Sequence, residues 1–260
     1  MKRLVVLLVC TTAAYAAPAE WRKLPKVEPA GRKVMTSSYT VRDRAEQNWT
    51  RPPFKYNEQV ATGRKHAKVI VLIYNPTVPT PDGGEAKLLD YVKGGDPVEY
   101  SYILANVIRE ASWGYINYEI ADIIEVDGFA RKVDGFLYTG ESFMKAREKG
   151  EWQPATSSYR GFFEDNGLME RFKADPALTE VWVWGAGGMH WDEFAFYIPN
   201  RYARFGPTDN PWFYRPYDIP EDFDRTIWVM GFNYEVGPDN MIHSYTHRVE
   251  SMAALAMADG

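Results

Sequence analysis

Apolar residues follow two different periods along the chain, and these periods predict alternating strands and helices. Continuous apolar runs bounded by turn residues are typical of buried strands, whereas apolar positions that recur every three or four residues indicate helices. Runs of the first kind predict strands over 68–76, 115–129, 131–143, 178–188 and 224–235. The helical period predicts helices over 96–114, over 160–176 and within 236–252.

The helix over 96–114 has the clearest sequence signals. Asp96 is a suitable N-cap, Pro97 occupies the first helical position, and Gly114 follows the last turn. Helices that alternate with fully apolar strands are typical of parallel sheets, because such strands are buried on both faces. We therefore expect an α/β fold with a largely parallel sheet and helices on both faces, a three-layer sandwich.

The ends of the chain differ in character from its middle. Residues 1–16 have two early cations, a short apolar run and the Ala14-Tyr15-Ala16 triplet, which is the layout of a secretory signal peptide. Residues 17–65 predict an irregular basic leader, and residues 66–260 predict a single α/β domain. Within that domain, the segment after the strand over 178–188 is rich in aromatics and prolines, so we expect an irregular loop there.

Charge and apolar length exclude two classes of partner. Residues 66–260 carry 17 Lys and Arg against 30 Asp and Glu. Nucleic acid binding needs clustered cations, so this acidic body argues against it. No apolar run after the signal approaches the length of a membrane span. We expect a secreted or periplasmic protein.

The strand ends carry the candidate residues for binding and catalysis. Ligands of parallel sheets gather beyond the carboxyl ends of the strands. The most suitable general acid or base there is Glu235, paired with Asp192 or Glu193 from another strand end. The side chains that we expect to contact a substrate are Trp191 and Tyr234 by stacking, and Asn233 and Asn75 by hydrogen bonds. An alternative is that the aromatic residues pack only on one another.

A second candidate is a divalent metal site, with zinc as the typical ion. His243 and His247 stand four residues apart on the last predicted helix, and His190 or Glu235 could add a ligand. Two features argue against the site. The face with both histidines lies opposite the apolar stripe, and Ser244 stands where zinc proteases with two helical histidines have a glutamate. The segment that includes His190 and Glu193 could nevertheless cover this face.

The segments GFNYE and HSYTHRVES, within 231–251, resemble a family of secreted bacterial proteins of uncharacterised activity. The resemblance spans roughly residues 132–252. It implies a secreted globular domain in which the two segments belong together, and it implies no activity or cofactor. Members of that family continue past this helix, so the resemblance also implies that the domain is incomplete at its carboxyl end.

Three functions agree with these patterns. The leading expectation is a hydrolase that acts on an extracellular polysaccharide by carboxylate acid/base chemistry at Glu235. The second is a carbohydrate-binding or cell-envelope interaction module without catalysis. The third is a metal-dependent peptidase or esterase that uses His243, His247 and Glu235.

Overall fold

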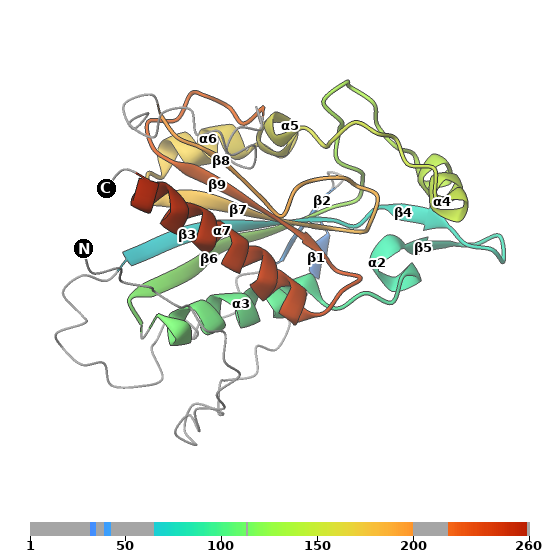
Figure 1. Cartoon of the computed structure of the whole chain (residues 1–260). Coiled ribbons are helices and arrows are strands. Elements are labelled where there is room, and N and C mark those ends of the chain that lie inside the picture. Colours follow the sequence, from blue (N-terminus) through green and yellow to red (C-terminus); the bar gives the residue numbers. More distant parts are fainter. Residues whose placement is uncertain (1–31, 35–38, 43–64, 113, 200–217, 259–260) are drawn as a thin grey trace, which may run out of the picture.

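The computed structural model of the protein describes residues 32–34, 39–42, 65–112, 114–199 and 218–258 (Figure 1). The predicted signal peptide lies outside these residues. The strands are β1 (Arg32–Val34), β2 (Tyr39–Arg42), β3 (Lys65–Tyr74), β4 (Thr77–Pro79), β5 (Glu85–Lys87), β6 (Ile116–Val126), β7 (Leu178–Gly185), β8 (Phe194–Tyr197) and β9 (Ile227–Asn233). The helices are α2 (Leu88–Tyr91), α3 (Pro97–Ala111), α4 (Gly140–Lys149), α5 (Tyr159–Glu164), α6 (Leu168–Ala174) and α7 (Pro238–Ala258).

The main sheet has the order β1-β2-β6-β3-β7-β9-β8. Strands β6, β3, β7 and β9 are parallel to one another. Strands β2 and β8 flank them, antiparallel to β6 and β9 respectively. This confirms the prediction of a largely parallel sheet. Strand β3 supplies the centre of the core, because the side chains from Val69 to Ile73 are fully buried. A continuous apolar run is what a strand covered on both faces requires.

Helices cover both faces of the sheet. Helices α3 and α7 lie together on one face, and α5 and α6 lie on the other (Figure 1). The indole of Trp184 in β7 donates a hydrogen bond to Ser101 Oγ of α3 at 2.9 Å. Asp96 caps α3 as its sequence predicts, and its side chain accepts a hydrogen bond from the Val98 N–H. No helix within the described residues is long and apolar enough to cross a membrane.

Four local predictions are corrected. The segment over 131–143 is a turn followed by α4, because Thr139 and Ser142 form a capping box that starts a helix there. The helix over 160–176 divides into α5, which ends at Glu164, and α6, whose N-cap is Gly167 with a φ of 64°. The leader is not wholly irregular, since β1 and β2 extend the sheet. The aromatic-rich segment includes strand β8.

Candidate functional site

Glu235, which follows β9, bonds both to the loop after β7 and to helix α4. Its carboxylate accepts a hydrogen bond from the Gly187 N–H at 2.7 Å and pairs in a bidentate manner with Arg147 of α4, with one distance of 3.1 Å. The hydrogen bond to Glu235 raises the pKa of Arg147. Because both carboxylate oxygens accept bonds from these groups, the geometry favours a structural role over the predicted acid/base role.

His190 bonds to a different set of partners. Its backbone adopts a φ of 58°, its Nδ1 lies 3.0 Å from the carbonyl oxygen of Gln153, and its ring packs against Trp152. The pKa of His190 is lowered mainly by burial and to a smaller extent by the nearby Lys132 ammonium. Within the described residues, no hydrogen bond joins His190 to Glu235. The two side chains that were each predicted as an additional metal ligand therefore make separate sets of contacts.

The residues predicted to contact a substrate are mainly structural. Tyr234 is fully buried, so its ring offers no surface for stacking. Asn75 is 1% exposed, and its amide binds Glu125 and the Leu89 N–H. The Asn233 Oδ1 accepts the Glu235 N–H at 2.9 Å and shapes the turn after β9. These three positions correct the prediction of a binding surface, because their polar groups are used inside the fold.

Trp191 and Asp192 lie in the segment between β7 and β8. The half-buried indole of Trp191 packs on Tyr74 and Phe162, with ring centroids 6.1 and 5.9 Å apart. The Asp192 N–H donates to the Tyr159 hydroxyl at 2.9 Å. Trp191 therefore contributes mainly to packing at the strand ends, and the backbone at Asp192 is fixed just before Glu193.

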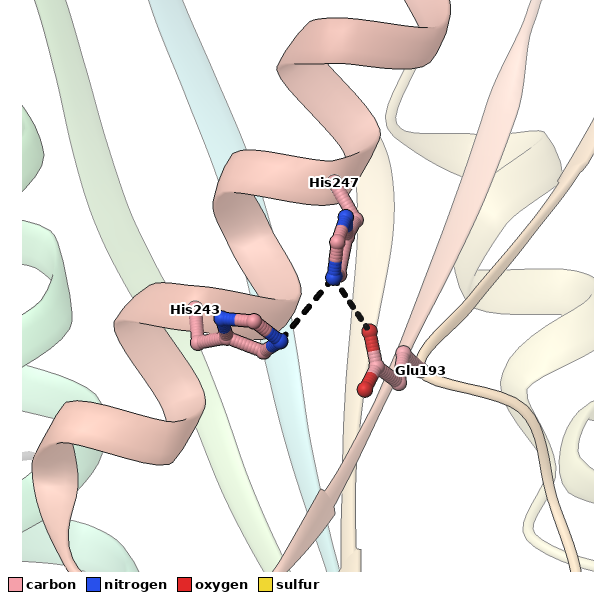
Figure 2. Close-up of side chains that lie close together, drawn as sticks. All are labelled: Glu193, His243 and His247. Carbon is pink, nitrogen blue, oxygen red and sulfur yellow. Dashed lines mark hydrogen bonds and ion pairs between the residues drawn. The ribbon is translucent and has the colours of Figure 1, made fainter. Parts of the chain in front are cut away.

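Glu193, which directly precedes β8, meets His243 and His247 of α7 (Figure 2). We call these three residues the His–Glu cluster. The two histidine Nε2 atoms lie 2.9 Å apart, and the His247 Nε2 lies 4.0 Å from Glu193 Oε2. One ligand atom from each residue falls within 4.8 Å of the others. Among the described residues, this is the group whose geometry fits a metal ion, and His190 and Glu235 do not belong to it.

The fold brings the cluster together from two elements. Spacing of four residues places both histidines on one face of α7. Glu193 is the residue directly before β8. Its carbonyl oxygen accepts a hydrogen bond from the Gly231 N–H of β9 at 2.9 Å. The side chains of His247 and Glu193 are 45% and 46% exposed. The predicted exposure of the histidine face is confirmed, and Glu193 is the residue that reaches it.

The separation of the two histidine nitrogens is close to that of two ligands of one metal ion, whereas the Glu193 oxygen, 4.0 Å from His247 Nε2, lies further out. Nitrogen ligands at 2.0–2.1 Å from a tetrahedral zinc ion lie about 3.3 Å apart, close to the separation of the two Nε2 atoms. Two unprotonated imidazole nitrogens repel each other at 2.9 Å unless a proton or a cation lies between them. A metal ion would take the place of that proton and draw the Glu193 carboxylate inward.

Glu250 supports the cluster from one turn further along α7. Its carboxylate Oε2 lies 3.1 Å from His247 Nδ1. A carboxylate on one ring nitrogen keeps the proton there and directs the lone pair of the other nitrogen outward. The three-residue spacing of His247 and Glu250 was a usable sequence signal for this contact, since both share the exposed face.

Comparison with family models, with curated proteins and with solved structures found no match. The resemblance of the GFNYE and HSYTHRVES segments to secreted bacterial proteins stays a prediction.

Proposed function

We propose that the protein binds a divalent transition metal ion of the zinc type through His243, His247 and Glu193. The observation that carries this proposal is the convergence of two Nε2 atoms and a carboxylate within 4.8 Å. Imidazole nitrogens favour zinc and its neighbours in the first transition row, whereas calcium and magnesium favour sites built of oxygen ligands. The donor set therefore selects the class of ion.

Exposure of the cluster leaves room for a fourth ligand. Three protein ligands with one open position is the arrangement of catalytic zinc sites, in which a bound water becomes a nucleophile near neutral pH. Such a site would support hydrolysis of an ester or amide bond by an exposed metal centre. This proposal uses Glu193 in place of Glu235, whose carboxylate is bonded to Arg147 and Gly187.

Zinc binding by the metal-free protein is expected to give one ion per chain, and His243→Ala is expected to weaken it by roughly 100-fold. Loss of one of three protein ligands removes both a bond and the shape of the site. Isothermal titration calorimetry with Zn²⁺ measures affinity and stoichiometry together. Calcium is expected to give no binding heat at this site.

The matched control is His66→Ala, since His66 is exposed and lies in β3, away from the cluster. It is expected to bind zinc as the wild type does. Circular dichroism of each variant checks that α7 remains folded. Equal zinc uptake by wild type and His243→Ala, or no uptake by either, would contradict the proposal.

Glu250→Ala is expected to weaken zinc binding by roughly 10-fold while the stoichiometry stays at one, because it frees the His247 ring to rotate and to change tautomer. Glu250→Gln should retain part of the affinity, since its amide oxygen can still accept the Nδ1–H bond. The same titration measures both variants. Glu170→Ala, which removes an exposed carboxylate from α6, serves as the control. If Glu250→Ala binds zinc with the affinity of the wild type, Glu250 does not orient the His247 ring. That result would not contradict the metal site formed by His243, His247 and Glu193.

A further inference from the structure

A hollow of about 600 Å³ opens at the carboxyl ends of β3 and β6. Tyr74 and Asp127 line it from the two strand ends, Thr139 from the start of α4, and Asn166 from the turn between α5 and α6. It shares no residue with the His–Glu cluster. The carboxyl edge of a parallel sheet is where ligands of such folds gather. The place of this hollow in the fold is therefore that of a binding site.

Each charged side chain that lines the hollow has a partner of opposite charge, either in the lining or beside it. Arg131 pairs with Asp165 through two hydrogen bonds of 3.1 Å, and Asp127 pairs with Lys87 at 2.6 Å. Among the described lining residues, Asp127, Arg131 and Asp165 are the charged ones. All three keep between a third and a half of their side-chain surface exposed. Such a lining offers many hydrogen bonds without the surplus charge that a phosphate or a cation requires.

Uncharged groups and an apolar rim complete the lining. The Asn166 amide donates to the Tyr74 hydroxyl at 3.0 Å, and Phe129 is among the lining residues. Leu137 lines the hollow and is 56% exposed, and the same turn exposes Val133 and Phe136. This turn holds three of the six large apolar side chains that are exposed among the described residues. Concentrated apolar exposure marks a surface for contact.

We propose that this hollow binds a neutral oligosaccharide. Sugar hydroxyl groups both donate and accept hydrogen bonds, so adjacent hydroxyls can bridge the Arg131–Asp165 pair and the Asn166 amide. The C–H faces of the sugar rings pack on apolar and aromatic side chains such as Leu137 and Phe129. An open hollow admits a segment of a longer chain. Sugar binding in the hollow does not use the metal ligands, so it can be tested independently of the proposed metal site.

The test is calorimetric titration of the full chain with three neutral probes, cellohexaose, chitohexaose and laminarihexaose, in the presence of a chelator. At least one is expected to bind in the micromolar to millimolar range. Arg131→Gln and Asn166→Ala are each expected to weaken that binding about 10-fold, because each removes direct hydrogen bonds to the sugar. The matched control is Arg160→Gln, since Arg131 and Arg160 both pair with Glu164, at 3.3 and 3.4 Å, but Arg160 does not line the hollow.

Three outcomes would overturn the proposal. The first is no binding of any of the three sugars. The second is sugar binding that neither Arg131→Gln nor Asn166→Ala weakens beyond the Arg160→Gln control. The third is tighter binding of inorganic phosphate or of hexagalacturonate, lost in Arg131→Gln, which would assign the hollow to an anionic ligand. Thermal unfolding of every variant separates loss of the site from loss of the fold.

Discussion

Replacing Arg248 by Met is expected to destabilise the protein by about 3 to 5 kcal/mol. The Arg248 guanidinium, on the inner side of α7, pairs with both oxygens of Glu180 in β7 at 2.7 Å, and its side chain is 12% exposed. Glu180 also accepts the Tyr118 hydroxyl and the Trp182 indole N–H. Removing the cation leaves a carboxylate that is 3% exposed without a counter-charge, and its desolvation is then uncompensated.

Stacking adds to this loss. The guanidinium lies 4.0 Å from the centroid of the Trp228 ring in β9, a contact that an aliphatic side chain keeps only in part. Because Arg248 links α7 to β7 through Glu180 and to β9 through Trp228, its replacement should also loosen the helix that carries His243 and His247. The free energy of unfolding, measured in urea, gives the size of the effect.

Two controls isolate the buried charge. Arg160→Met makes the same change at an exposed pair with Glu164, in which both side chains are 42% exposed, and it should cost less than about 0.5 kcal/mol. The double variant Arg248→Met with Glu180→Gln should recover part of the lost stability, because a neutral amide replaces the unpaired carboxylate. A cost for Arg248→Met no larger than that for Arg160→Met shows that the pair is not a major source of stability.

The sheet was predictable because strands that are buried on both faces have continuous apolar runs in the sequence. Strands such as β3 and β7 are buried on both faces over most of their length, so most of their positions need an apolar side chain. The segment over 131–143 misled the same reasoning. Its apolar residues Val133, Phe136 and Leu137 are exposed in a turn rather than buried in a strand. The signal that identifies α4 was the local capping pair of Thr139 and Ser142.

The candidate metal site was predictable in part. Helical spacing alone places His243 and His247 on one face, since that geometry is local. The third ligand depends on the pairing of β8 with β9, in which Phe194 lies opposite Met230. That register is set by tertiary packing of a strand in an aromatic-rich segment, where the sequence has no clear alternation. The sequence therefore predicted His190 or Glu235 as the added ligand, whereas Glu193, predicted as a catalytic carboxylate, is the residue that reaches the cluster.

Gly231→Ala is expected to destabilise the protein by about 3 kcal/mol, at the upper end of the usual cost of overpacking. A Cβ atom at this position would lie 2.2 Å from the backbone oxygen of Asp192 and 2.3 Å from Cδ1 of Trp191. A backbone atom cannot move away as a flexible side chain can. The segment 191–193 would have to shift, although the Gly231 N–H holds the Glu193 carbonyl oxygen.

The same substitution connects the packing at the strand ends with the proposed metal site. If residues 191–193 move, the Glu193 carboxylate moves away from His247, and zinc affinity should fall together with stability. The control is Gly128→Ala, whose Cβ would meet its nearest neighbour, Val126, at an ordinary contact distance of 3.7 Å. Urea unfolding and zinc titration of both variants measure the two effects. If Gly231→Ala is as stable as the wild type, residues 191–193 can shift at little cost in free energy. The packing at Gly231 would then not fix the position of Glu193.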